Sequence, residues 1–179
     1  MSDIKVASRY AKSLIDLAVE HNKLDSIYSD MKSFHEVASS NKDFIGLLDS
    51  PIIHTDKKQS VIRSSFGSGF DAMSMTFLDT VVRKGRESFL PLIAKEFVRM
   101  YNEMKGIATA VITTAVPLDA KSYDELKSKL EAETGKQIEF QTRIDPSIIG
   151  GFIIRIGDNL YDASLSNRLR NIKKELYLN

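Results

Sequence analysis

The sequence predicts an α+β protein with two domains, a six-helix bundle over residues 1–105 and a small α+β unit over 106–179. Before Gly106, apolar residues recur every three or four positions, which is the period of an amphipathic helix. After Gly106, β-branched residues and alternating polarity indicate strands. A hydrophobic fraction of 42% and a charged fraction of 27% over 179 residues are typical of a folded globular chain.

Six helices are expected in the first domain, over 4–21, 24–38, about 44–48, 55–66, 71–84 and 88–105. The break at Ser50-Pro51 ends the third helix, because proline disfavours a helical residue before it. Thr55 is expected to cap the fourth helix, and Gly85 to end the fifth. Pro91 fits the first turn of the sixth, where its missing N–H is not needed.

The second domain is expected to run in the order strand, helix, strand, strand, helix, over 107–115, 122–135, 138–144, 150–156 and 164–176. Ser122 and Glu125 have the spacing of a capping box at the start of its first helix. The turn residues at 157–159 predict that 160–163 fold back as a hairpin. Ser164 should cap the last helix, whose inward side chains are expected to be Leu165, Leu169, Ile172 and Leu176.

Composition excludes several classes of function. A net charge of +1 gives no long-range field to attract nucleic acid or an anionic membrane. The chain has no cysteine, which excludes disulfides, thiolate metal sites and a cysteine nucleophile. Its charged start lacks a signal-peptide core, and no stretch approaches the roughly 18 apolar residues of a membrane span. We expect a soluble protein that meets a membrane only through a partner.

The glycine-containing segments do not have the spacing of phosphate-binding loops. Gly150-Gly151 lacks a third glycine and precedes a strand, and Gly135-Lys136 is not followed by a hydroxyl residue. The three histidines fall on separate elements with no second ligand at metal spacing; they are His21, His35 and His54. We therefore expect no catalytic site, cofactor or metal, and an enzyme with an unrecognised site is the less favoured alternative.

The last helix carries Arg168, Arg170, Lys173 and Lys174. These residues could be a basic solvent face opposite the apolar stripe, or a patch for nucleic acid. The second interpretation gives an alternative function, an RNA-binding adaptor that uses the basic C-terminal helix. The near-zero net charge and the lack of an aromatic stacking motif on the strands favour the first interpretation.

Two of the expected helices carry more apolar surface than one face needs. On the first, two adjoining stripes span an arc of about 180°, against about 100° for an ordinary surface helix; they contain Val6, Tyr10, Leu14 and Leu17 beside Ile4, Ala7, Ala11, Ile15 and Ala18. On the fifth, the arc reaches about 200° and contains Met73, Met75, Phe77, Leu78, Val81 and Val82. Either both helices lie at the centre of the bundle, or they leave a groove for an amphipathic partner helix.

Three segments resemble the delta subunit of bacterial F-type ATP synthases, a family that includes the mitochondrial oligomycin-sensitivity-conferring protein. "ASRYAKSLIDLAVE" resembles the opening helix of that family, and "VVRKGRESFLPLIAKEF" resembles its passage from the fifth to the sixth helix. "IDPSIIGGFIIRIGDNLYDASLSNRLRNIKKEL" resembles its C-terminal signature and is the most specific of the three. The resemblance covers essentially the whole chain.

This resemblance implies a non-catalytic stator subunit that links the catalytic head to the peripheral b stalk, so that rotor torque drives ATP synthesis. The N-terminal helix of an alpha subunit would bind between the first and fifth helices, at Tyr10, Ser13, Leu14, Leu17, Phe77, Thr80, Val81 and Lys84. The C-terminal domain would contact the end of the b stalk through a platform that includes Gly150, Gly151, Arg155, Asp158 and Arg168. The subunit would be monomeric, present once per complex, free of nucleic acid, and peripheral on the cytoplasmic side of the bacterial inner membrane.

Overall fold

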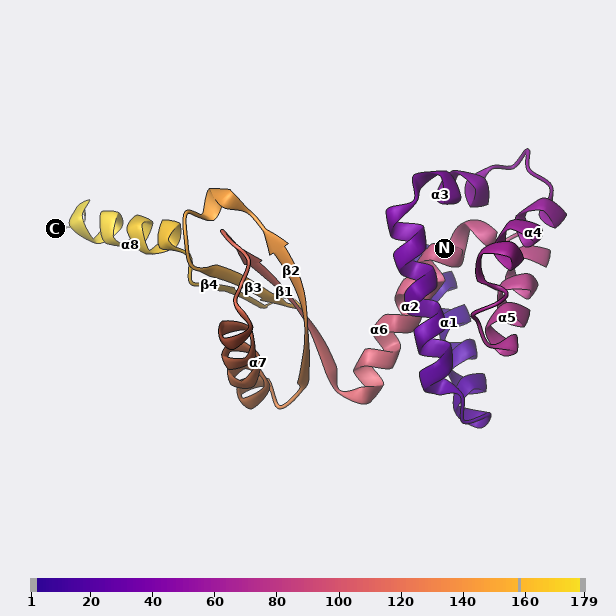
Figure 1. Ribbon diagram of the computed structural model, residues 1–179, viewed down its shortest axis with the longest axis horizontal. Helices are drawn as coiled ribbons and strands as arrows, with labels where there is room; N and C mark the ends of the chain where they lie inside the picture. The colour runs from indigo at the N-terminus through magenta and orange to yellow at the C-terminus, as the bar shows by residue number, and fades with distance from the viewer. Residues whose placement is uncertain (1–2, 158, 178–179) are drawn as a thin grey trace. The chain divides into compact units, whose positions relative to one another are not determined.

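The computed structural model describes residues 3–157 and 159–177 and confirms the α+β fold class (Figure 1). The chain divides into two compact units, with the boundary between Tyr101 and Asn102. The sequence predicts this boundary at residues 105 and 106, one helical turn later. The last turn of helix α6 (Leu90–Lys105) belongs to the second unit, within which the Asn102 side-chain amide donates to Thr109 Oγ1 at 3.5 Å.

The first unit is helical along its length. Before α6 come α1 (Asp3–Glu20), α2 (Leu24–Ser40), α3 (Lys42–Asp49), α4 (Thr55–Phe66), α5 (Ala72–Arg83) and the short 3-10 helix η1 (Glu87–Phe89). The Asn41 side chain caps α3 by accepting from the amides of Asp43 and Phe44. Thr55 is not the cap of α4, contrary to the sequence prediction. The helical hydrogen bonds already start at the His54 carbonyl, which accepts from Lys57 and Lys58.

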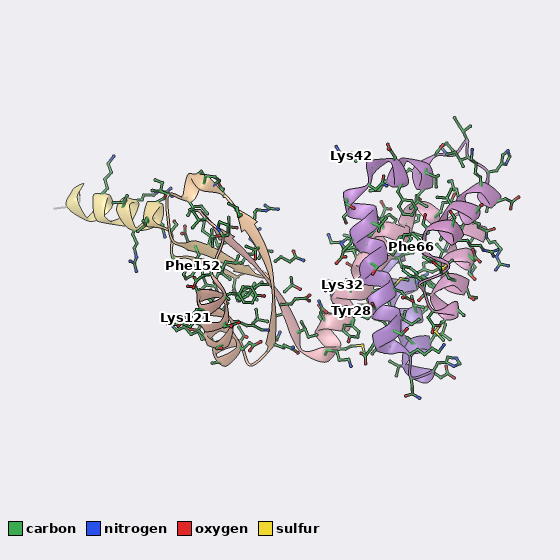
Figure 2. All side chains as sticks on the ribbon, in the orientation of Figure 1. Tyr28, Lys32, Lys42, Phe66, Lys121 and Phe152 are labelled. Atoms are coloured by element: carbon green, nitrogen blue, oxygen red, sulfur yellow. The ribbon has the colours of Figure 1, made fainter. Side chains whose placement is uncertain are left out.

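The core of the bundle combines small and aromatic side chains. Three alanines of α1 have essentially no exposed surface and allow neighbouring helices to approach closely; they are Ala7, Ala11 and Ala18. Four rings from α2, α3, the end of α4 and the segment after it lie within 6.0 Å of a neighbour, and they belong to Phe34, Phe44, Phe66 and Phe70. Phe66 is labelled inside the bundle in Figure 2. Burial of these side chains is the main favourable contribution to the stability of this unit.

The end of α6 is fixed against α2 by a stacked pair of tyrosines. The rings of Tyr28 and Tyr101 are 3.8 Å apart, and the Tyr101 hydroxyl donates to Asp25 at 2.7 Å. Burial, reinforced by this hydrogen bond, raises the pKa of Tyr101 to about 12. Lys32 approaches the Tyr28 ring, and both are labelled in Figure 2.

The second unit is a four-stranded mixed sheet in the order β2-β1-β3-β4. Its elements are β1 (Ile107–Thr114), α7 (Ala120–Thr134), β2 (Gln137–Ile144), η2 (Pro146–Ile148), β3 (Phe152–Ile156), β4 (Asn159–Asp162) and α8 (Leu165–Tyr177). β1 and β2 are parallel, because α7 connects them as a crossover helix. β3 runs antiparallel to β1, and β4 pairs with β3 in the hairpin that the turn residues predict.

One face of this sheet packs against α7. Leu130 of α7 joins Ala110, Ile112, Ile138 and Ile154 of the strands in a buried cluster. Phe152 and Ile156, which lie two residues to either side of Ile154 on β3, pack against the same cluster. The predicted capping box is wrong, because the helix starts earlier: Tyr123 N already donates to the Asp119 carbonyl, so Ser122 lies inside α7.

The start of α8 matches the prediction, but its packing does not. Ser164 Oγ accepts from the Asn167 amide, which makes Ser164 the predicted cap. Leu165 and Leu169 were expected to be inward but are exposed, because α7 already covers the apolar face of the sheet. The side chains of Ile172 and Leu176 lie outside the described ones.

The Gly150-Gly151 pair allows a close approach between the start of β3 and the start of α8. Gly151 has a φ of +80°, and a Cβ there would run into the Ala163 carbonyl oxygen. Across this approach the Leu165 amide donates to the Gly150 carbonyl at 2.9 Å. Gly151 is therefore required by backbone packing, whereas a Cβ on Gly150 would meet only the Leu165 side chain.

Substitution Gly151→Ala should destabilise the second unit more than Gly157→Ala. Both glycines have a positive φ, but a Cβ on Gly157 would meet nothing within 4 Å. We expect Gly157→Ala to lower the free energy of unfolding by about 1 kcal/mol. Gly151→Ala should lower it by the same amount and by roughly 1–2 kcal/mol more, because of the clash. Hydrogen exchange of the β3 amides in increasing urea measures both, and equal losses would contradict the clash with Ala163.

Candidate partner-binding groove

A cleft of about 450 Å³ lies between α1 and α5. Its lining consists of Leu14 and Leu17 from α1 and of Ala72, Met73, Thr76, Phe77 and Thr80 from α5. The hydroxyls of Thr76 and Thr80 donate to the carbonyls one turn earlier on α5, each at 2.7 Å. Because these hydroxyls are satisfied within their own helix, the cleft offers a mainly apolar surface.

The wide apolar arcs of the two helices divide between the core and this cleft. On α1 the alanine stripe is buried, while Leu17 keeps 45% of its surface exposed. On α5 Leu78 and Val82 are buried, while Phe77 is only half-buried. Each helix is central in the bundle and still leaves apolar surface beside the other.

The structure brings together four of the eight residues predicted for the groove, since Leu14, Leu17, Phe77 and Thr80 line the cleft. Tyr10 lies at the edge of it, with its ring 6.5 Å from that of Phe77 in an edge-on arrangement. Ser13 and Lys84 are exposed beside the cleft, and the Ser13 hydroxyl donates to the carbonyl of Arg9.

Two of the eight, Leu14 and Val81, have no exposed surface and belong to the core; Leu14 still borders the cleft, but Val81 does not line it. Three lining residues are not among the eight; they are Met73, which belongs to the predicted apolar arc of α5, and Ala72 and Thr76, which do not. They continue the Phe77 and Thr80 face at three- and four-residue steps, so the helical period alone could have found them.

The two ends of the cleft differ in charge. At one end the Arg86 guanidinium donates to the Tyr10 hydroxyl at 2.6 Å and lies 5.6 Å from the centre of its ring. At the other end Lys23 pairs with Asp71 at 2.8 Å. The hydrogen bond from Lys23, followed by that from the Met73 amide, lowers the pKa of the Asp71 carboxyl. Asp71 also caps α5, so the pair fixes the start of that helix against the end of α1.

The residues predicted for the stalk platform fall in two places. Gly150 and Gly151 lie where β3 and α8 meet, and Arg168 is exposed on the first turns of α8. Arg155 lies on the sheet face opposite α7, in a hollow of about 480 Å³ that also contains Val111, Thr113, Arg143, Asp145, Ile153 and Leu160. Asp158 lies outside the described residues.

Within 3–157 and 159–177, no group of three or more acidic, histidine or cysteine residues has a geometry that could hold a metal ion. No helix in these same ranges has both the length and the apolar character that a bilayer crossing requires.

Comparisons with known proteins agree with the fold and extend over the whole chain. A family model described as "ATP synthase delta (OSCP) subunit" matches residues 6–176. The ATP synthase subunit delta of Christiangramia forsetii is 34% identical over 176 residues, which cover 98% of this chain and 95% of that protein. The subunit delta of Brevibacillus brevis is 34% identical over 170 residues, with 95% and 97% covered.

A solved structure shares the architecture as well. A chain in the cryo-EM structure of the Toxoplasma gondii mitochondrial ATP synthase hexamer superposes with a TM-score of 0.73 at 25% identity, covering 96% of this chain and 97% of that one. Since the family model and the bacterial relatives span almost the full length, this chain belongs to the ATP synthase delta (OSCP) subunit family.

Proposed function

We propose that this chain is a non-catalytic stator subunit of a proton-translocating F-type ATP synthase. Its first unit binds the N-terminal helix of an alpha subunit in the α1–α5 cleft, and its second unit binds the C-terminal end of the peripheral b stalk. The observation that carries the proposal is the apolar cleft between two helices whose apolar arcs exceed what the core encloses.

A helix is the partner that suits this cleft. The lining offers aliphatic, aromatic and methyl groups and few unsatisfied polar atoms, so an extended chain with free backbone groups would gain little from binding. A helix satisfies its own backbone and buries one apolar stripe, at about 25 cal/mol per Å² of apolar area before the costs of association. Met73 adds an adaptable surface to the lining.

The role requires binding without chemistry. Proton flow turns the rotor, and the catalytic head would turn with it unless a second connection held it. A subunit that grips the head with one unit and the stalk with the other supplies this connection, as a monomer present once per complex. Membrane association then comes through the complex, on the cytoplasmic side. None of the relatives named above is described as an RNA-binding protein, and no observation favours that alternative.

The substitutions Leu17→Asp and Phe77→Asp should each weaken binding of the alpha-subunit N-terminal peptide while the bundle stays folded. A carboxylate in the apolar cleft would be desolvated without a partner, which costs about 2 kcal/mol or a factor of about 30 in affinity. Titration calorimetry with the peptide from the same organism measures this loss, and circular dichroism checks the fold.

Val19→Asp is the matched control. Val19 also lies on α1 and is 48% exposed, close to the 45% of Leu17, but it does not line the cleft. The affinity of the Val19→Asp variant for the peptide should equal that of the unaltered protein. If all three variants bind alike, the assignment of the cleft is wrong, whether or not the subunit works as a stator.

A further inference from the structure

The second unit holds an isoleucine in a backbone conformation that β-branched residues rarely adopt. Ile149, which follows η2, has a φ of +68° and a ψ of −38°, and 71% of its surface is exposed. A glycine would fit this position without strain. Because the Ile149 side chain is exposed, its burial does not offset the cost of the strained backbone. A strained residue that presents an aliphatic side chain to solvent indicates a functional surface.

Ile149 adjoins the first turn of α8. Leu165 rests on the neighbouring Gly150, where a Cβ would lie only 2.8 Å from Leu165 Cδ1. The Ser166 hydroxyl donates to the Ile148 carbonyl at 3.0 Å, so this turn is fixed to the segment that carries Ile149. Leu169 follows one turn later on the same helix face and is 60% exposed. We name the surface formed by Ile149, Leu165 and Leu169 the α8 patch.

The surroundings of the α8 patch are basic. From Leu165 to Lys174 the sequence has four basic residues and no acidic one. Arg168 and Arg170 are exposed on the helix beside the patch. The Asp162 carboxyl accepts from the Ser164 amide. Hydrogen bonding with the Ser164 side chain, followed by that with the Ser164 amide, lowers the pKa of Asp162, with a smaller contribution from Arg170. An apolar stripe edged by cations complements a helix whose apolar stripe is edged by carboxylates.

We propose that the α8 patch is the surface on which the second unit takes an acidic amphipathic helix of the stalk subunit. This inference rests on the proposed function and narrows it to three side chains and one partner chemistry. The hollow on the open sheet face is the competing surface. Its lining also sets cations, Arg143 and Arg155, beside apolar residues, but it includes the carboxylate of Asp145 and, unlike the α8 patch, no aliphatic residue with a positive φ.

Three single substitutions in the full-length protein test this inference. Ile149→Gly removes the side chain together with the strain, so it should bind the stalk more weakly although it unfolds at a higher urea concentration. Leu169→Glu places a negative charge where acidic residues are expected to approach. Leu160→Glu is the control, because Leu160 is 57% exposed but lies in the sheet hollow.

The probe is the soluble C-terminal half of the stalk subunit from the same organism, titrated in a calorimeter. We expect the affinity for the stalk segment to fall about tenfold for Ile149→Gly, to fall further for Leu169→Glu and to stay unchanged for Leu160→Glu. Higher salt should also weaken the binding of the stalk segment to the unaltered protein, because the basic residues beside the patch are exposed.

The other outcomes separate this inference from the proposed function. If the stalk segment binds and only Leu160→Glu weakens it, the sheet hollow is the site and the inference fails while the stator role stands. If the segment does not bind the unaltered protein at all, the stalk half of the proposed function fails too. If light scattering shows a dimer that Leu169→Glu dissociates, the patch takes a second copy of this chain, which also overturns the inference.

Discussion

The substitution Val81→Asp is expected to unfold the N-terminal bundle. Val81 has no exposed surface and lies on the side of α5 that faces the core, among Leu78 and Val82. An aspartate there would be an unpaired charge or a protonated polar group in an apolar site, and either costs about 4 kcal/mol or more. Domains of this size are stable by only about 5–15 kcal/mol in total, so the substitution would remove from about a quarter to most of the stability of the bundle.

The neighbouring Thr80→Asp is the matched control for this prediction. Thr80 lines the cleft and is half-buried, so its carboxylate can remain in water. Thermal unfolding followed by circular dichroism should show a large drop in Tm for Val81→Asp and a small one for Thr80→Asp. Equal melting temperatures for the two variants would show that Val81 is a surface residue.

This result decides how binding data at the groove should be interpreted. Val81 is one of the residues that the family resemblance implies for alpha-subunit binding, yet it cannot touch a partner without rearrangement of the core. We expect that Val81→Asp abolishes peptide binding only because the groove is no longer formed. Leu17 and Phe77, which line the cleft, report on contact itself.

The substitution Lys58→Met should be the second strongly destabilising change. The Lys58 side chain is 3% exposed, and its ammonium donates to Glu87 Oε1 at 2.6 Å and to the Leu48 carbonyl at 2.8 Å. Glu87 Oε2 is buried with no hydrogen-bond partner among the described residues, so the ammonium is its main compensation. Removal of the cation leaves a carboxylate largely out of water, at a cost of about 3–5 kcal/mol.

The double variant Lys58→Met, Glu87→Leu provides the control for that change. Replacement of both partners by apolar residues of similar volume removes the uncompensated charge and should restore most of the lost stability. Urea denaturation of the wild type, both single variants and the double variant completes the cycle. If the double variant is as unstable as Lys58→Met alone, packing around the lysine chain, not the ion pair, holds α3, α4 and η1 together.

Most of the secondary structure could be predicted from local patterns. The helical period, the glycine at position 106 and the Ser164 cap depend on residues near one another in the chain, and the structure agrees with each of them. The predicted caps at Thr55 and Ser122 failed for a related reason. Several neighbouring residues can occupy the cap position of a helix, and the residue whose carbonyl accepts the first helical hydrogen bond is the cap. In this structure those residues are His54 and Asp119.

Local patterns in the sequence predict the helices and strands and the excess of apolar surface on α1 and α5. The packing of the elements makes Val81 a core residue, places Phe77 in a cleft, and leaves Leu165 and Leu169 exposed. The physical reason is that periodicity fixes the angle of a side chain around its own helix, but burial depends on which other element lies opposite. Because α7 covers the apolar face of the sheet, Leu165 and Leu169 of α8 do not pack on that face and remain exposed.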